Sequence, residues 1–287
     1  MPLRGDIPVK TFCDSGGSKM RILVCVKQVP DGKEIEIDPK TNNLIREGVP
    51  SMINPFDAYT LEVAVRIKEV TKNTEISVLS MGPMQAKEVL RTCLSVGADK
   101  AYLCSDEDVF RGSDTLATSY ILASAIKKIE AEEGAFDLIM AGKQAVDCET
   151  GQVGPEIAAH LGIAQVTYAL EVTNGSTSII VKRNSDEGYD MVSVQKPAVV
   201  TVEKPIYNPR YPSIKSKIEA NKKEIKVLTA QDIPGLDVSR CGVQGSPTSV
   251  DRMYAPTRNK HCVKIEEETL AASATKLVDL LVEAKKL

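Results

Sequence analysis

The most chemically suggestive residues of the sequence lie in one loop, from Ala141 to Val153. Gly142 and Gly151 have no side chain and permit a close approach of the backbone to a ligand. A helix beginning near Gly151 would present the unpaired N–H groups of its first turn, residues 151–153, to an anion. The helix dipole favours negative charge at the same end. The pattern predicts a phosphate or nucleotide site.

Two polar side chains of this loop could add to such a site. Asp147 could accept a hydrogen bond from a ribose hydroxyl, and Thr150 could cap the helix or donate to a phosphate. The same two residues could instead only shape a tight turn between a strand and a helix. Their spacing is compatible with both interpretations.

Signatures of other chemistry are absent from the sequence. Neither the Walker A pattern nor G-x-G-x-x-G occurs, and no Ser/His/Asp or Cys/His set stands out, so we assign no catalytic residue. No two of the seven cysteines form a C-x-x-C pair, and only His160 and His261 accompany them, so we predict no metal site. A stand-alone catalyst is therefore disfavoured.

Composition narrows the class of protein further. The formal net charge of -3 argues against nucleic-acid binding, which needs a basic surface to displace counterions. No stretch approaches the roughly 18 to 20 apolar residues of a membrane span. The odd number of cysteines, several of them in apolar segments, predicts reduced thiols and a cytoplasmic location.

The elements that must position the loop follow from hydrophobic periodicity. Short apolar runs rich in β-branched residues alternate with segments of helical spacing, which predicts an open, mostly parallel twisted α/β sheet of Rossmann-like type with helices on both faces. The predicted strands are 21–26, 75–80, 98–104 and 136–140, and the predicted helices are 54–70 (with Asp57 as N-cap), 83–96, 113–132 and 151–161.

After residue 163 the pattern changes to strands without helices. Segments 167–172, 178–183, 189–194 and 198–202 are separated in part by Asn-Gly and Glu-Gly turns, so we expect them to pair largely antiparallel. Earlier in the chain, 34–38 and 44–46 could form a small hairpin. The last segment, 266–286, has the apolar stripe of a terminal helix that needs a docking surface, on its own domain or on a partner.

Ligands of an open parallel sheet bind beyond the carboxyl ends of the strands, where the strand order reverses. The candidate nucleotide-binding residues are those that fall at these ends: Cys25, Val26, Lys27, Asn54, Phe56, Asp57, Met81, Gly82, Gly142, Gln144, Ala145, Val146, Asp147, Thr150, Gly151, Gln152 and Val153.

A second feature is the basic segment 204–226. It holds seven Lys or Arg residues against two Glu residues, with tyrosines and isoleucines between them. Such a segment is compatible with a solvated charged face. It is equally compatible with a docking loop whose basic charge steers an acidic partner onto apolar anchors.

Several linked motifs resemble those of the electron transfer flavoprotein β (small) subunit. They follow the family's order over about residues 20–287: VCVKQVP at 24–30, MINPFD at 52–57, AGKQA at 141–145 with Asp147, TGQ at 150–152, KPAVVT at 196–201 and PSI at 212–214. The resemblance implies an adenine-nucleotide-hydrolase-like α/β domain over 20–203, after a flexible extension at 1–19. It also implies a C-terminal arm and helix over 227–287 that contact a larger α subunit.

The resemblance carries roles as well. The α subunit would hold the FAD that passes single electrons, with Phe56 of this chain near it, and this chain would hold a second nucleotide, FAD or AMP, among the residues at the strand ends. Segment 204–226 would be the recognition loop for dehydrogenase partners. Its docking residues would be Arg210, Tyr211, Ile214, Lys215 and Lys217.

One local feature favours FAD over AMP. Members that bind AMP have several extra residues between the aspartate and the TGQ motif, whereas here only Cys148 and Glu149 intervene. Residues 150–155 and 245–248 also resemble the electron-bifurcating branch. There the small-subunit FAD takes a hydride from NADH, and the electrons part between a ferredoxin- or flavodoxin-type acceptor and a dehydrogenase or quinone-reducing partner.

The subunit would then be redox-active only within its complex. Two alternatives stay open at this stage. One is a non-bifurcating flavoprotein subunit that holds a structural AMP, and the other is a stand-alone sensor that binds an adenine nucleotide.

Overall fold

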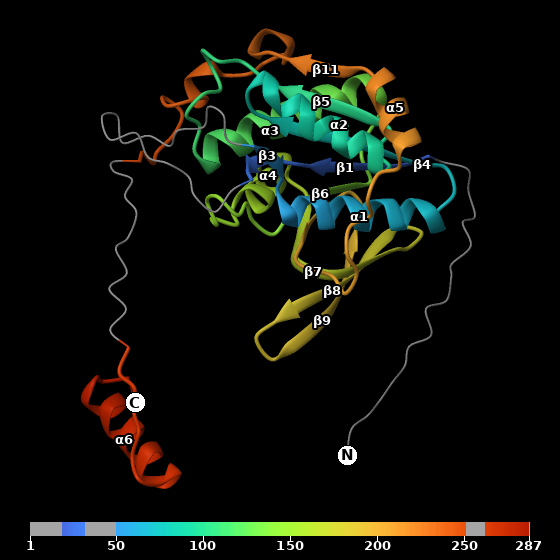
Figure 1. Ribbon diagram of the computed structural model, residues 1–287. Coiled ribbons are helices and arrows are strands. Elements are labelled where there is room, and N and C mark those ends of the chain that lie inside the picture. The colour runs from blue at the N-terminus through green and yellow to red at the C-terminus, as the bar shows by residue number, and fades with distance from the viewer. Residues whose placement is uncertain (1–18, 32–49, 251–261, 287) are drawn as a thin grey trace.

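A nine-stranded sheet forms the centre of the molecule, in the order β11-β5-β4-β1-β6-β10-β7-β8-β9 (Figure 1). The computed structural model describes residues 19–31, 50–250 and 262–286. The hairpin expected at 34–38 and 44–46, and nearly all of the N-terminal extension, lie outside these ranges. The predicted α/β class, with its mostly parallel sheet, is confirmed.

Apart from the edge strand β11, the parallel part of the sheet is largely buried on both faces. It consists of β1 (Met20–Cys25), β4 (Thr74–Met81), β5 (Lys100–Cys104), β6 (Leu138–Gly142), β10 (Ala198–Val202) and β11 (Ile225–Leu228). Alternate residues of β1 face opposite sides, so that Ile22 packs in one hydrophobic core and Leu23 in the other, both fully buried. The continuous apolar runs in the sequence result from this double burial.

Helices cover the two faces of the sheet. The first core contains side chains of α1 (Pro55–Val70), α2 (Lys87–Val96) and α5 (Ile214–Lys222). The second contains side chains of α3 (Thr115–Glu133) and α4 (Val153–Leu161). The helices therefore lie on the sheet in two layers, as predicted.

One predicted pairing is wrong for the last of the four later strands. β7 (Ala164–Asn174), β8 (Ser178–Ser185) and β9 (Gly188–Gln195) pair antiparallel as expected, but β10 runs parallel to both β6 and β7. All five residues of β10 are buried. A strand without a polar face cannot lie at the edge of an antiparallel meander, so the chain returns and inserts it in the middle of the sheet.

The sequence patterns also missed several short elements. These are the edge strand β11, the helix α5 and a two-stranded antiparallel ribbon of β2 (Gln28–Pro30) and β3 (Ser51–Ile53). β11 joins the same sheet as β5, so this sheet extends beyond residue 203. α5 begins after Ser213, whose side-chain oxygen accepts a hydrogen bond from the N–H of Ser216 at 3.1 Å.

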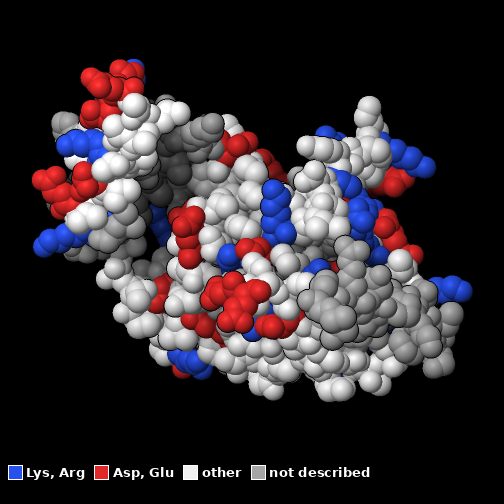
Figure 2. Space-filling model, turned by 90° about the horizontal axis from the view of Figure 1, so that it is seen from below, with Lys and Arg blue, Asp and Glu red and all other residues white. Residues whose placement is uncertain are grey.

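Helix α6 (Leu270–Glu283) lies apart from the sheet (Figure 1). Thr269 caps it, and none of its side chains is buried. No helix in the described ranges is both long enough and apolar enough to cross a membrane. Basic and acidic side chains both occur on the face seen in Figure 2, which fits the small net charge.

Candidate functional site

The strand order reverses at β1, where the sequence predicts that a ligand binds; we call the ends of β1 and β6, the first turn of α1 and the loop that follows β6 the crevice. From β1 the chain builds β4 and β5 on one side, and it then places β6 on the other side. The connections that follow β1 and β6 lead to α1 and α4 on opposite faces of the sheet. The ends of these two strands, Cys25 and Gly142, therefore border the place where ligands of such sheets bind.

Asp57 joins the ends of β1 and β6 to the first turn of α1. Its Oδ2 accepts from the N–H of Lys27 at 2.7 Å, and its Oδ1 accepts from the N–H of Gly142 at 3.1 Å. The carboxylate therefore does not cap α1, and the expectation of an Asp57 N-cap is wrong: Asn54 occupies the cap position, and Pro55 opens the helix. Burial raises the pKa of Asp57 to about 7, while the two N–H donors act to lower it.

Asn54 supports the loop that follows β6. It is 1% exposed, and its side-chain amide donates to the carbonyl of Gln144 at 2.8 Å and accepts from the N–H of Val146 at 3.2 Å. Both polar atoms of its side chain are thus engaged within the protein. Asn54 and Asp57 shape the walls of the crevice rather than offering free groups to a ligand.

The loop itself is a compact turn. The N–H groups of Cys148 and Glu149 donate to the carbonyl of Ala145 at 3.3 Å and 2.8 Å. Glu149 and Gly151 have φ angles of 54° and 65°, in the left-handed region. Glycine adopts this conformation without strain, which explains the residue type at position 151.

Lys27 places a positive charge in the crevice. Its ammonium group donates to Asp147 Oδ1 at 2.8 Å and contacts Cys148 Sγ at 3.6 Å. The Asp147 side chain is 15% exposed and the Lys27 side chain is 42% exposed. The pair spans the crevice from β1 to the loop, so that a cation and a hydroxyl-accepting carboxylate lie side by side.

The amino end of α4 has the free donors expected of an anion site. The N–H groups of Gly151, Gln152 and Val153 donate to no residue within the described ranges. The helix begins at Val153, two residues later than predicted. No side chain caps it, so the expected capping role of Thr150 is wrong. Thr150 is exposed, so donation to a ligand and a purely structural role in the turn are the interpretations of its hydroxyl that the structure leaves open.

Cys25 and Met81 complete the crevice from β1 and β4. Burial, reinforced by the nearby charge of Asp57, raises the pKa of the Cys25 thiol to about 12. The thiol is therefore neutral at physiological pH and acts as a small apolar wall instead of a nucleophile. Gly82, which follows β4, donates its N–H to the carbonyl of Cys104 at 3.1 Å and keeps this end of the sheet closed.

Sequence reasoning missed two polar features near the strand ends. Ser80, in β4, is 1% exposed, and its Oγ has no hydrogen-bond partner in the described part of the chain. Asp114, at the start of α3, accepts from both the N–H and the hydroxyl of Thr248, at 3.0 Å and 2.8 Å. Serine within an apolar strand is the one pattern that could have indicated Ser80, and no local pattern links residues 114 and 248.

These groups fit a bound nucleotide. Free N–H groups at a helix terminus suit a phosphate, Asp147 suits a ribose hydroxyl, and the unpartnered Ser80 hydroxyl supplies a further polar group at the strand ends. In the described ranges there is no group of three or more His, Cys, Asp or Glu side chains that could hold a metal ion. The arrangement can bind and orient an anionic cofactor, and we find no set of side chains for covalent catalysis.

The structure separates the five candidate docking residues into two groups. Tyr211 and Ile214 are 96% and 80% exposed, and Lys215 and Lys217 are exposed beside them on α5. Arg210 instead turns inward, toward α1, and pairs with Glu62 and Glu69. The sequence did not distinguish these two arrangements.

Comparison with known proteins identifies the family of the chain. Residues 41–233 match the electron transfer flavoprotein domain. The "Electron transfer flavoprotein subunit beta" of Megasphaera elsdenii is 44% identical over 93% of this chain and 99% of the relative. The "Caffeyl-CoA reductase-Etf complex subunit CarD" of Acetobacterium woodii is 45% identical over 92% of this chain and 98% of the relative. "Protein FixA" of Azorhizobium caulinodans is 39% identical over 90% and 92%.

The matched residues 41–233 include α1, α4 and the loop between β6 and α4, and the Megasphaera elsdenii relative aligns with 93% of the chain. At this level of identity and coverage, the resemblance first seen in short motifs extends over the folded chain. The chain therefore belongs to the electron transfer flavoprotein family, among its β (small) subunits.

Proposed function

We propose that this chain is the small subunit of a heterodimeric, electron-bifurcating flavoprotein and holds an FAD between the ends of β1 and β6. The observation that carries the proposal is the compact loop of residues 144–153, whose last N–H groups are free and whose Asp147 and Thr150 are separated by only two residues. A short loop covers less of the crevice than a longer one. It leaves room for a ring system beyond an adenosine phosphate.

Named groups of this chain would hold the cofactor. The N–H groups of residues 151–153, the Thr150 hydroxyl and the Lys27 ammonium suit its phosphates, and Asp147 suits a ribose hydroxyl. A bound flavin would accept a hydride from NADH and release the electrons one at a time. The protein binds it, orients it and keeps its phosphate charge balanced.

The proposed complex includes further proteins. The names of the relatives support a larger α subunit as the obligate partner, because one is a "subunit beta" and the other is a subunit of a reductase–Etf complex. We assign the C-terminal arm, 227–287, to that contact and the segment 204–226 to docking of a dehydrogenase or quinone-reducing partner. A ferredoxin- or flavodoxin-type protein would accept the low-potential electron, and the complex would work in the cytoplasm.

The decisive experiment is a count of bound cofactors on the complex. The chain is co-expressed with its α subunit, and nucleotides released by denaturation are quantified by chromatography. We expect two FAD per heterodimer and bleaching of the flavin absorbance on addition of NADH. One FAD with one AMP would exclude bifurcation and leave a structural-nucleotide subunit. A stable monomer that binds adenine nucleotide without flavin would instead indicate a sensor.

A further inference from the structure

The segment between β10 and α5 is held to the rest of the protein at very few points. Among residues 204–212, only Arg210 takes part in a hydrogen bond with another residue of the described ranges. Pro205 is buried and Tyr207 is half-buried, with the guanidinium of Arg66 stacked over its ring at 4.0 Å. The far end of the segment therefore depends on Arg210.

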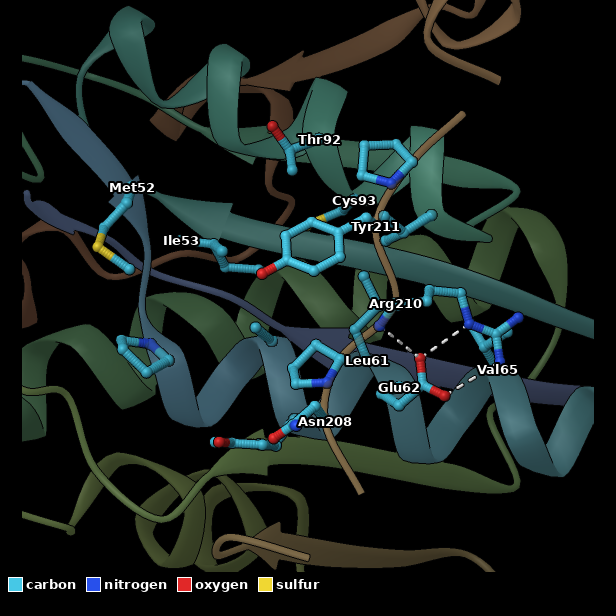
Figure 3. A pocket seen from close by; sticks show the side chains of 16 residues that line it. Met52, Ile53, Leu61, Glu62, Val65, Thr92, Cys93, Asn208, Arg210 and Tyr211 are labelled. Atoms are coloured by element: carbon cyan, nitrogen blue, oxygen red, sulfur yellow. Dashed lines mark hydrogen bonds and ion pairs between the residues drawn. The ribbon is translucent and has the colours of Figure 1, made fainter. Parts of the chain in front are cut away.

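Arg210 binds to a carboxylate that is itself buried. Glu62 lies on α1 with a side chain only 2% exposed. It accepts from Arg210 through the backbone N–H at 3.1 Å, Nε at 2.8 Å and Nη2 at 3.1 Å, and Arg66 Nε adds a fourth contact at 2.7 Å. Arg210 Nη1 also donates to Glu69 at 2.7 Å. We call Glu62, Glu69 and Arg210 the latch; Figure 3 shows its Glu62 and Arg210 side chains.

Close packing does not hold residues 208–212 in place of the latch. Beneath residues 208–212 lies a pocket of about 480 Å³, bounded by α1, α2 and β3. Its walls are mainly apolar, with Ile53, Leu61 and Val65 on one side and Tyr211 and Pro212 on the segment itself (Figure 3). The segment thus spans a hollow, and the bonds of Arg210 fix its path where dispersion contacts are sparse.

The outer side of the same segment is apolar. Ile206 is fully exposed and Ile214 is 80% exposed, while Tyr211, which borders the pocket, is 96% exposed. Exposed apolar side chains bind a partner well only when their positions are fixed beforehand, because ordering a free segment on binding costs affinity. The bonds of Arg210 to Glu62 and Glu69 therefore fix the positions of the exposed side chains beside it.

We propose that Glu62 and Arg210 are positioning residues for partner docking, which hold residues 206–214 in the conformation that the partner recognises. This rests on the proposed docking role of segment 204–226. Arg210 then acts through Tyr211 and Ile214 and does not itself contact the partner. The Arg210 guanidinium donates two hydrogen bonds to the Glu62 carboxylate, and the Arg210 backbone N–H donates a third. Lysine cannot reproduce this arrangement.

The charge state of the latch is consistent with this role. Burial alone would raise the pKa of Glu62, but hydrogen bonds from Arg210 and Arg66 outweigh it and hold the pKa below its usual range. The carboxylate is therefore charged at neutral pH. The latch weakens only as the pH falls through that lowered pKa.

The test compares Arg210→Gln and Arg210→Lys with two matched controls in the complete flavoprotein complex. Tyr211→Ala removes an exposed apolar side chain, and Lys217→Gln, a control for hydrogen exchange alone, removes the same single charge from an exposed position. Glu62 keeps Arg66 as a partner in the Arg210 variants, so the fold is retained. Two quantities are measured. One is the amide hydrogen exchange at position 210, whose N–H donates to Glu62, and the other is the KM for a purified flavin-containing dehydrogenase as electron-exchanging partner.

We expect Arg210→Gln to speed exchange at position 210 about tenfold or more, with a raised KM, since charged hydrogen bonds are lost. Arg210→Lys should be intermediate, and flavin content and NADH oxidation with an artificial dye should not change. Tyr211→Ala should raise the KM without altering exchange, and Lys217→Gln should leave exchange unaltered.

The outcomes separate the two levels of the proposal. Unchanged exchange in Arg210→Gln would overturn the latch. Faster exchange with an unchanged KM, while Tyr211→Ala raises the KM, would overturn the positioning role but keep the docking surface. An unchanged KM in both variants would show that the segment does not dock this partner, and the positioning role would fall with it.

Discussion

The carboxylates near the crevice divide into those that shape the protein and one that is available to a ligand. Asp57 is buried and holds two backbone N–H groups, whereas Asp147 makes a single ion pair, with Lys27 at 2.8 Å. Because that pair is exposed on the Lys27 side, a ligand hydroxyl can approach Asp147 without breaking the fold. The burial and the bonds of each carboxylate therefore predict which substitution affects binding and which affects stability.

We predict that Asp147→Ala weakens binding of the small-subunit nucleotide by about 1.5–3 kcal/mol, the value of a hydrogen bond to a charged group. Fluorescence titration of the cofactor-depleted complex with FAD measures the change. Glu149→Gln is the control, because it removes a charge from the same loop at an exposed position. Equal FAD affinity in Asp147→Ala and in the unmodified complex would contradict the role.

At the scale of elements, the crevice depends on how closely α1 approaches the end of β6. A Cβ atom added at Gly142 would lie 2.8 Å from Phe56 Cβ and 2.9 Å from the Phe56 carbonyl carbon. The backbone of the first turn of α1 therefore occupies the space that a side chain would need. The glycine is required by the packing of two elements that are far apart in the sequence.

We expect Gly142→Ala to lower the free energy of unfolding by about 1–3 kcal/mol, since the helix must move away from the strand. Gly82→Ala is the matched control: its added Cβ would meet only Ala86 Cβ, at an ordinary 3.5 Å. Thermal unfolding of both variants by circular dichroism gives the comparison. The argument fails if the two substitutions shift the melting temperature equally.

At the scale of the whole molecule, no part of the chain that the structure describes covers α6. Leu270 is 91% exposed and Val282 is 55% exposed, and no hydrogen bond or ion pair joins the helix to the sheet within the described ranges. The sequence left open whether the apolar stripe docks on the domain or on a partner. The separate position of α6 favours the partner (Figure 1).

Deletion of residues 263–287 should therefore leave the melting temperature of the isolated chain unchanged and weaken its assembly with the α subunit. Size-exclusion chromatography of mixed subunits at micromolar concentration, or analytical ultracentrifugation, measures the second effect. A lower melting temperature of the isolated chain would show that α6 docks on its own domain. Undiminished assembly would remove the arm from the subunit interface.

The sequence by itself determined the class of fold, and it predicts a ligand site at the carboxyl ends of the strands. Runs such as 21–26 can only be strands buried on both faces, and their alternation with amphipathic segments requires a parallel sheet. Because strand ends gather at one edge of such a sheet, residues 25–27, 54–57 and 142–153 could be grouped without coordinates. Their linked motifs also indicated the family, which the comparisons confirmed.

Only the tertiary structure decided the partners of individual side chains. The parallel insertion of β10, the inward turn of Arg210 and the two N–H bonds of Asp57 each join residues far apart in the chain. Local patterns report which side chains prefer burial, and they carry no record of which distant group satisfies a buried charge. A carboxylate therefore accepts two backbone N–H bonds at position 57 and binds Arg210 at position 62. By our proposal, the carboxylate at position 147 contacts a ligand.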